Sequence, residues 1–324
     1  MEDEPMAMDH QRLPLSTGSE CTMVYGRPGP ALRDWVLGYR GYRMRLPQPR
    51  RRIEVPTDVI TLALGFEGVI SLVDAVEPGP VARFTSVVSG LRRTATIAAH
   101  DGRLRGVTVS LTPQGAYRMF GPVAAELGNR WTDVSEVIGR GATELVDRLA
   151  GAAGWPARFG ILDAFFTAGL AEGTEWDPAV ARAWNALRAS GGQTTVEQLT
   201  DLTGWSRRRL ELRFRSQIGV PPKQVAQITR LQRTLEAFEA PGRPCGALIA
   251  ERCGFYDQAH LDRTFKGMVG CSPREFFGWR DLGAGLPEPT DRLRGRVTSA
   301  ALLPAADGPA GPAYFDRPVL TGRF

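Results

Sequence analysis

Residues 199–206 (LTDLTGWS) and residues 249–256 (IAERCGFY) are two copies of one pattern, and this repeat decides the fold of the C-terminal half of the chain. The glycines of the two copies, Gly204 and Gly254, lie 50 positions apart. Each copy continues with two apolar residues, a glycine and a proline: Leu210, Phe214, Gly219 and Pro222 in the first, and Leu261, Phe265, Gly270 and Pro273 in the second. Each copy therefore reads as helix, glycine turn, helix, glycine stop and proline.

This order of residues is what a helix-turn-helix unit needs. Such a unit has a small residue where its helices cross, a glycine at the turn and apolar anchors on its second helix. Between the copies, Val225, Ile228, Leu231 and Leu235 recur at helical spacing and predict one long helix over residues 222–239. We therefore predict two units in tandem that read two stretches of the DNA major groove.

Charge is placed unevenly along the chain. Residues 178–280 hold 16 Arg and Lys against 9 Asp and Glu, a net charge of +7, whereas the whole chain carries +5. The remainder is therefore slightly acidic. A basic C-terminal domain beside a near-neutral N-terminal one fits nucleic-acid binding by the former.

The composition argues against several other classes of protein. No apolar run approaches the length of about 18 residues that spans a bilayer, and the acidic start of the chain predicts no signal peptide. The four cysteines (Cys21, Cys245, Cys253 and Cys271) form no CxxC pair, and there are three histidines, so we expect no metal site and no cofactor. Reduced thiols predict a cytoplasmic protein, found at the nucleoid when bound to DNA.

Length and patterning predict an α+β chain of two domains. The expected order is a loose N-terminus (1–30), a β-rich, barrel-like or cupin-like sensor or dimerisation domain that ends in helices (31–172), an all-α domain of two helix-turn-helix subdomains joined by a long helix (173–281), and a disordered tail (282–324). The tail prediction rests on its content of Gly, Pro and Ala.

Short alternating runs mark the strands of the N-terminal domain. The candidates are residues 35–39, 59–64, 69–73, 84–88, 94–98 and 107–111, with Gly, Pro or Asp turns between them. Residues 100–102 (HDG) read as a hairpin turn. From about residue 114 to 172 the pattern becomes helical, with an apolar stripe of Ala142, Leu145, Val146 and Leu149.

Capping residues locate the starts of the C-terminal helices. Thr194 with Glu197 predicts a capping box, and Ser206 and Asp257 are the expected N-caps of the two recognition helices. Residues 272–275 (SPRE) combine an N-cap, a proline at the first helical position and an acid at the third.

A helical wheel at 100° per residue separates the DNA-facing side from the buried anchors. The residues we assign to DNA contact are Ser206, Arg207, Arg208, Glu211, Leu212, Arg213 and Arg215 in the first recognition helix, and Gln258, Ala259, His260, Asp262, Arg263 and Lys266 in the second. Arginine donates two hydrogen bonds to guanine, glutamine pairs similarly with adenine, and a carboxylate accepts from cytosine. Leu212 occupies the place of Arg263 in the second copy. It touches thymine methyl groups, packs against its own domain or contacts nothing.

Residues 254–266 (GFYDQAHLDRTFK) and 270–276 (GCSPREF) resemble the signature of the AraC/XylS family of transcriptional regulators. The resemblance covers residues 178–281. It implies two helix-turn-helix subdomains on one long helix, entering successive major grooves. In that family the residue at the place of Arg263 commonly contacts bases, whereas Leu212 stands where members often have Arg. Arg208 or Arg213 is the expected substitute.

The N-terminal half resembles the sensor domains of an actinobacterial branch of the same family. The resemblance lies in residues 107–121, which end LTPQGAYRMFG, and in Glu126 and Leu127. It implies a β-rich domain that binds an effector or dimerises. Trp35, Tyr39, Arg43 and Arg45 are candidate effector ligands, with wall residues of a barrel as the alternative reading.

Two other functions compete with a sequence-specific regulator. A non-specific architectural protein would bind DNA through phosphates alone, but a net charge of +7 over this domain is low for that role. An enzyme fused to a DNA-binding domain is disfavoured because Cys21 alone precedes residue 245, and no Ser-His-Asp set or phosphate-cradling loop is present. The expected partner is double-stranded promoter DNA, with RNA polymerase, a small-molecule effector and a second copy of the chain left open, and no membrane.

Overall fold

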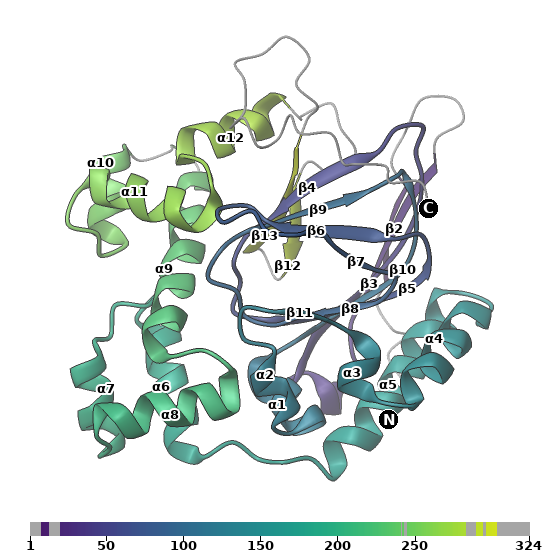
Figure 1. The fold of residues 1–324 in the computed structure, drawn as a ribbon, viewed down its shortest axis with the longest axis horizontal. Coiled ribbons are helices and arrows are strands. Elements are labelled where there is room, and N and C mark those ends of the chain that lie inside the picture. The colour runs from purple at the N-terminus through teal and green to yellow at the C-terminus, as the bar shows by residue number, and fades with distance from the viewer. Residues whose placement is uncertain are drawn as a thin grey trace.

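The computed structural model describes residues 8–12, 20–240, 242, 245–282, 290–293 and 296–302. Two antiparallel sheets form the N-terminal part, and helices form most of the rest (Figure 1). The expected α+β class with a β-rich N-terminal domain and a helical C-terminal domain is confirmed. No described helix combines the length and apolar character needed to cross a membrane.

Thirteen strands are described, in two sheets. The first sheet has the order β1 (Met8–Arg12), β2 (Glu20–Gly26), β3 (Val36–Arg45), β10 (Arg103–Leu111), β5 (Ile60–Glu67), β8 (Val87–Ser89) and β11 (Trp131–Asp133). The second has the order β12 (Thr290–Leu293), β13 (Arg296–Leu302), β4 (Arg50–Glu54), β9 (Thr96–His100), β6 (Ile70–Asp74) and β7 (Ala82–Phe84). Five of the six predicted strands are present within a few residues of their expected places. The sixth, residues 84–88, is wrong as one strand, because the chain bends at residues 85–86 and splits it into the end of β7 and the start of β8, which lie in different sheets.

The turn at His100, Asp101 and Gly102 joins β9 to β10, but not as the expected hairpin. The two strands it connects belong to different sheets, because β9 pairs with β4 and β6 while β10 pairs with β3 and β5. The left-handed Gly102, at φ +101°, turns the chain from one sheet to the other. Alternation alone identifies a strand but not its partner, so this crossing could not be predicted from the strand pattern.

Helices cover one face of the first sheet. They are the short 3₁₀ turn η1 (Pro30–Leu32) and helices α1 (Pro113–Phe120), α2 (Val123–Glu126), α3 (Val134–Ile138), α4 (Gly141–Gly151) and α5 (Trp155–Ala171). Helix α5 lies close to β2 and β3 because glycine occupies the contact positions. A Cβ atom on Gly41 would come within 2.3 Å of the Trp155 ring, and Phe159 stacks on Tyr39 with their ring centroids 5.5 Å apart.

The C-terminal helices follow the predicted order closely. They are α6 (Pro178–Ala189), α7 (Val196–Thr203), α8 (Arg207–Ile218), α9 (Pro222–Glu239), α10 (Gly246–Arg252), α11 (Gln258–Val269) and α12 (Pro273–Leu282). Figure 1 shows α9 running between the α7–α8 unit and the α10–α11 unit. Its buried Val225, Ile228, Leu231 and Leu235 are the stripe that predicted it.

Three of the four predicted caps are present. The Ser206 side chain accepts from the Arg209 amide, Asp257 accepts from the His260 amide, and Ser272 and Glu275 bond reciprocally. The fourth prediction is wrong by one residue. Thr195 and Gln198 form the capping box of α7, because Thr194 instead donates its hydroxyl to Ser190 and to the carbonyl of Ala186.

Both terminal predictions need correction. The N-terminus was expected to be loose to residue 30, but β2 pairs with β3 and buries Val24 completely. The tail was expected to be disordered from residue 282, but β12 and β13 form a hairpin whose second strand pairs with β4. The open edge of β4 supplies backbone partners, and Val297 and Ala300 supply buried apolar contacts that the overall composition concealed. The expected disorder of residues 303–324 lies outside the described residues.

Both turn glycines adopt the left-handed conformation that the repeat predicts, with φ +68° at Gly204 and +73° at Gly254. Replacing Gly254 by valine should destabilise the protein by roughly 1–3 kcal/mol, because a β-branched residue is strained there. Urea unfolding followed by circular dichroism measures this. Gly267→Ala in α11 is the control, since its added methyl meets no atom within 4 Å, and it should be neutral or stabilising. Equal stability of Gly254→Val and wild type would contradict the turn assignment.

Candidate nucleic-acid interface and sensor cavity

The two recognition helices, α8 and α11, are built alike. Each has 12 residues, begins at a side-chain N-cap and ends at a left-handed glycine, Gly219 at φ +86° and Gly270 at φ +89°. Leu210 and Phe214 in α8, and Leu261 and Phe265 in α11, are at most 2% exposed. The same anchors therefore fix both helices in their units, and matching positions of the two helices face matching directions.

The outward face of α8 is strongly basic. Ser206, Arg207, Arg208, Arg213 and Arg215 are exposed, and Glu211 is half-buried. The Arg207 Nε donates to the Glu211 carboxylate at 3.3 Å, one helical turn away. Leu212 is 64% exposed, so the alternative that it packs against its own domain is wrong. This exposure fits both remaining alternatives, contact with a thymine methyl group and no contact at all.

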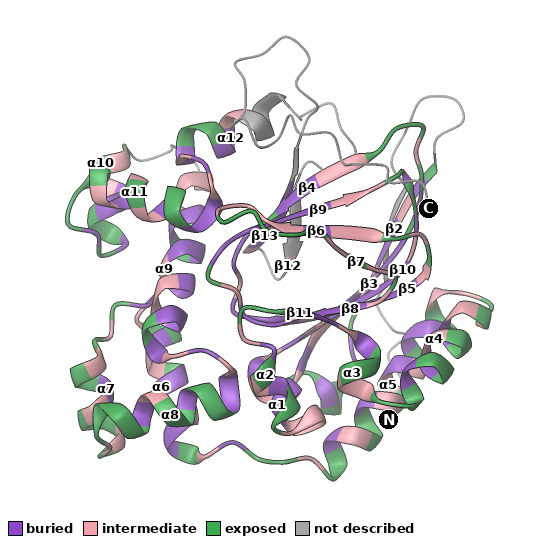
Figure 2. Ribbon diagram, in the orientation of Figure 1, coloured by how far each residue is buried: buried purple, intermediate pink, exposed green. Residues whose placement is uncertain are grey.

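The outward face of α11 is mixed in charge. Gln258, Ala259, Arg263 and Lys266 are exposed, while Asp262 and His260 are half-buried. His260 also has a local task, because its Nδ1 accepts from the Tyr256 amide at 3.3 Å and its ring meets Phe255 edge-on. One ring nitrogen is thus engaged inside the turn. Figure 2 shows that α8 and α11 each carry both buried and exposed residues, as a helix between a core and a groove requires.

Sequence reasoning missed three residues on this surface. Tyr256 is 92% exposed in the turn before α11, the most exposed of the large apolar side chains described. At the corresponding turn of the first unit, the Arg209 guanidinium lies over the Trp205 ring, 4.8 Å from its centroid. The signal was available, since Trp205 and Tyr256 are both aromatic and lie 51 positions apart, the spacing that also separates Leu210 from Leu261.

The N-terminal domain contacts both helix-turn-helix units at matching places. A Cβ on Gly219, at the end of α8, would lie 2.6 Å from the Ala125 carbonyl oxygen, and one on Gly270, at the end of α11, would lie 2.6 Å from that of Ala75. The Ala95 amide also donates to the Met268 carbonyl at 2.7 Å. The N-terminal domain therefore holds the C-terminal ends of both recognition helices, while their outward faces stay exposed.

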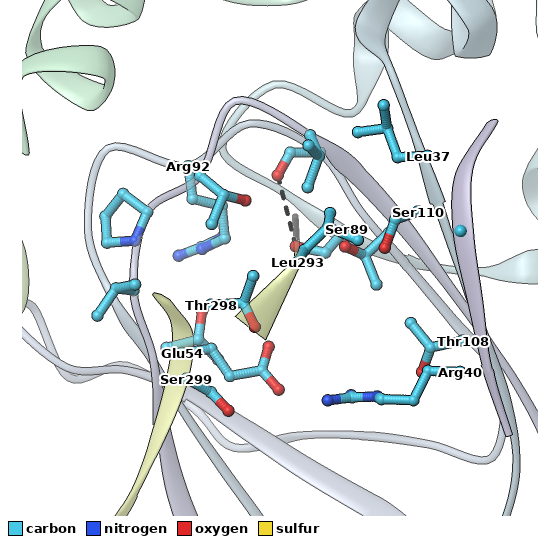
Figure 3. Close-up of a pocket in the computed structure, with 18 of the residues that line it drawn as sticks. Leu37, Arg40, Glu54, Ser89, Arg92, Thr108, Ser110, Leu293, Thr298 and Ser299 are labelled. Carbon is cyan, nitrogen blue, oxygen red and sulfur yellow. Dashed lines mark hydrogen bonds between the residues drawn. The ribbon is translucent and has the colours of Figure 1, made fainter. Parts of the chain in front are cut away.

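A cavity of about 240 Å³ lies in the N-terminal domain, with lining residues from both sheets. Its wall includes Arg40, Glu54 and Arg92, shown in Figure 3, together with the threonines Thr57, Thr61, Thr94, Thr96, Thr108 and Thr298. A second cavity of about 100 Å³ shares Arg40 and Glu54 with the first and adds Arg50, Arg52 and His100. Strand β13, which follows α12 and β12 in the chain, thus supplies part of the cavity wall.

Of the four candidate effector ligands, Tyr39 lines the larger cavity. Its hydroxyl donates to the Asp163 carboxylate at 2.7 Å. The other three line neither cavity: Arg43 pairs with Glu20 at 3.5 Å, Arg45 is exposed, and Trp35 lies beneath the Arg118 guanidinium. The sequence pattern predicted the strand but did not predict which of its residues line the cavity.

We expect His100 to make the stability of the N-terminal domain depend on pH. Burial and the neighbouring Arg50 lower the pKa of His100 from 6.5 to about 4. Between these values the unfolded chain binds a proton that the folded chain rejects, so the free energy of unfolding should fall by up to ~1.4 kcal/mol per pH unit as the pH drops from 6.5 to 4. Urea unfolding across this range tests it. His100→Asn should have a shallower slope, and an unchanged slope would show that other groups cause it.

Comparisons with known proteins bear on this arrangement. Residues 199–278 match the helix-turn-helix domain family. No curated protein matches the chain. Among solved structures, ToxT from Vibrio cholerae is similar at 13% identity and a TM-score of 0.43, covering 74% of this chain and 97% of ToxT. A ToxT bound to an unsaturated fatty acid is 12% identical with a TM-score of 0.41, over 71% of this chain and 93% of that one. The AraC-like transcriptional activator CuxR is 16% identical with a TM-score of 0.31, over 72% of this chain and 87% of that one.

The matched segment begins at Leu199 in α7 and ends within α12, so it spans both units and the helix between them. Two recognition helices with equal lengths, equivalent anchors and equivalent stops make the pair a duplicated DNA-binding element rather than a single motif. The chain therefore carries a helix-turn-helix domain at residues 199–278, built from two equivalent helix pairs.

Proposed function

We propose that this protein is a sequence-specific transcriptional regulator whose helices α8 and α11 enter successive major grooves of promoter DNA. The observation that carries the proposal is the pair of equivalent helices with anchored inner faces and exposed polar outer faces. A single basic helix face is common on soluble proteins, but two in register on one connecting helix are what a two-groove reader needs.

The exposed side chains of α8 and α11 fall into two groups, those assigned to bases and those assigned to phosphates. Arg208 and Arg263 stand on the outward arcs and are assigned to guanine, and Gln258, in the first turn of α11, to adenine. Leu212 offers an apolar contact to a thymine methyl group. Arg207 and Arg213 lie near the core edge of α8, and Arg215 and Lys266 lie on the outward arcs. All four are assigned to phosphates, which position the protein without reading sequence.

An architectural role is the second candidate, and the exposed faces argue against it. A protein that binds phosphates alone needs cations on its surface, whereas α11 carries glutamine, alanine and a carboxylate beside its two cations. The cavity in the N-terminal domain is further support for regulation, since it offers a place for a small-molecule effector. Sensing through this cavity is the second part of the proposal.

Selection from a random DNA library by the full-length protein, at near-physiological salt with excess competitor, tests the first part. The expected result is one motif with two blocks about one helical turn, roughly 10 base pairs, apart. Recovery of no motif, together with equal affinity for all fragments and a steep salt dependence, would establish sequence-blind binding and overturn the proposal.

A further inference from the structure

Arg92 joins the cavity to the parts of the N-terminal domain that hold the two helix-turn-helix units. Its side chain lines the larger cavity and is 11% exposed. One terminal nitrogen donates to the Asn129 carbonyl at 2.8 Å, and the other to the Asp74 carboxylate at 2.8 Å. The Trp131 ring lies beneath the guanidinium, 3.8 Å from its centroid to Cζ. These contacts fix the plane and both terminal nitrogens of the group.

Asn129 belongs to the segment that contacts the first unit and the long helix. Its side chain exchanges two hydrogen bonds with Gln224, at the start of α9. A Cβ on the preceding Gly128 would meet the Gly219 carbonyl oxygen at 2.1 Å, so the backbones touch where α8 ends. A change in the position of this segment therefore reaches α8 and α9 directly.

Asp74 belongs to the segment that contacts the second unit. The next residue, Ala75, lies against Gly270 at the end of α11. Its amide donates to the Ala95 carbonyl at 2.9 Å, and the Ala95 amide donates to Met268 in α11. The hydroxyl of Thr94, which also lines the cavity, donates to the same Asp74 oxygen as Arg92. Arg92 thus bonds to both segments, the one that contacts the end of α8 and the one that contacts the end of α11.

The third guanidinium nitrogen of Arg92, Nε, is buried and makes no hydrogen bond within the described residues. A buried donor without an acceptor is costly, so a binding site commonly supplies one. The two cavities together are lined by four arginines (Arg40, Arg50, Arg52 and Arg92) and one carboxylate, Glu54. With Asp74, which pairs with Arg92 from behind the wall, two carboxylates stand against the four arginines. Their surplus of positive charge favours an anion, and the threonine hydroxyls favour polar groups beside it.

We propose that the effector is a small, polar organic anion whose acid group accepts a hydrogen bond from Arg92 Nε, and that the same residue relays its binding to both recognition helices. The ligand draws on the guanidinium that already bonds Asn129 and Asp74, so it alters how firmly the two segments hold the ends of α8 and α11. The proposal rests on the effector-sensing part of the proposed function and names both the ligand class and the route.

Small anions serve as probes, because the site recognises charge and an acceptor oxygen. Acetate, D-gluconate and inorganic phosphate are titrated into the full-length protein against sodium chloride at equal ionic strength, with the melting temperature as readout. At least one probe should raise it saturably by about 2 °C or more. Arg92→Gln should abolish the rise. The matched control is Arg93→Gln, since Arg93 is 53% exposed, pairs with Glu77 and lies outside the cavity lining.

Hydrogen exchange measured by mass spectrometry tests the relay. The active probe should change the exchange of peptides covering Met268 and Gly219 in wild type and in Arg93→Gln, but not in Arg92→Gln. If Arg92→Gln does not fold, Arg92→Lys is used; it keeps the charge but lacks the forked geometry, and should keep part of the thermal shift while losing the exchange response.

The proposal is overturned if no probe raises the melting temperature above chloride, if Arg92→Gln responds like wild type, or if the shift occurs without any change at the helix ends. None of these measurements uses DNA. Their failure therefore leaves the DNA-reading role intact, and a failed DNA selection leaves the anion site intact, so the two outcomes are distinguishable.

Discussion

Replacing Phe265 by alanine should lower the free energy of unfolding by about 3–5 kcal/mol and remove the second recognition helix from its place. Phe265 is 2% exposed and meets Phe276 edge-on, with ring centroids 5.8 Å apart. The truncation leaves a cavity between α11 and α12. The other buried residues of α11, Leu261, Met268 and Val269, are smaller than Phe265. Urea unfolding gives the stability loss, and binding to the selected motif gives the functional loss.

The control for this truncation is the neighbouring Lys266→Ala. Lys266 is exposed, so its loss should change stability by no more than about 0.5 kcal/mol. It should weaken binding to all DNA alike and lower the salt slope by about one. A loss below about 1 kcal/mol in Phe265→Ala would mean that this residue does not anchor the helix.

Replacing Arg263 by alanine should weaken binding to the selected motif by about 1–3 kcal/mol and relax the preference at one or two base pairs. The reason is that an arginine pairs in a fork with guanine, so its removal affects one base rather than the general attraction. Arg263 is exposed on the outward arc of α11, and the protein should stay folded. Competition between motif and random DNA measures the effect, and an equal loss on both would assign Arg263 to a phosphate.

The C-terminal domain could be predicted from the sequence because its information is local. The glycine turns, the caps at Ser206 and Asp257 and the limits of α9 follow from residues within a few turns of one another. The prediction of the α7 capping box failed because two adjacent threonines, Thr194 and Thr195, can each cap a helix. Helix α7 begins at Val196, so Thr195 is the N-cap.

The N-terminal domain was predictable in its strands but not in their assembly. The cavity takes its wall from β3, β4, β10 and β13, whose residues are distant in sequence, and strand patterning does not identify partners. The pairing of β13 with β4 was not predicted, because the sequence around β13 is rich in Gly, Pro and Ala and was interpreted as a disordered tail. The sequence does not distinguish Arg92 from the other arginines, because its partners Asn129 and Asp74 and the cavity that it lines are brought together by the fold.

The central claim, that α8 and α11 read two separate blocks of one site, is tested most directly by repeating the DNA selection with Arg208→Ala and Arg263→Ala. The account predicts that each variant keeps one block of the motif and loses preference within the other, and that the affected blocks differ between the two variants. Both variants blurring the same block, or both recovering the wild-type motif, would contradict it.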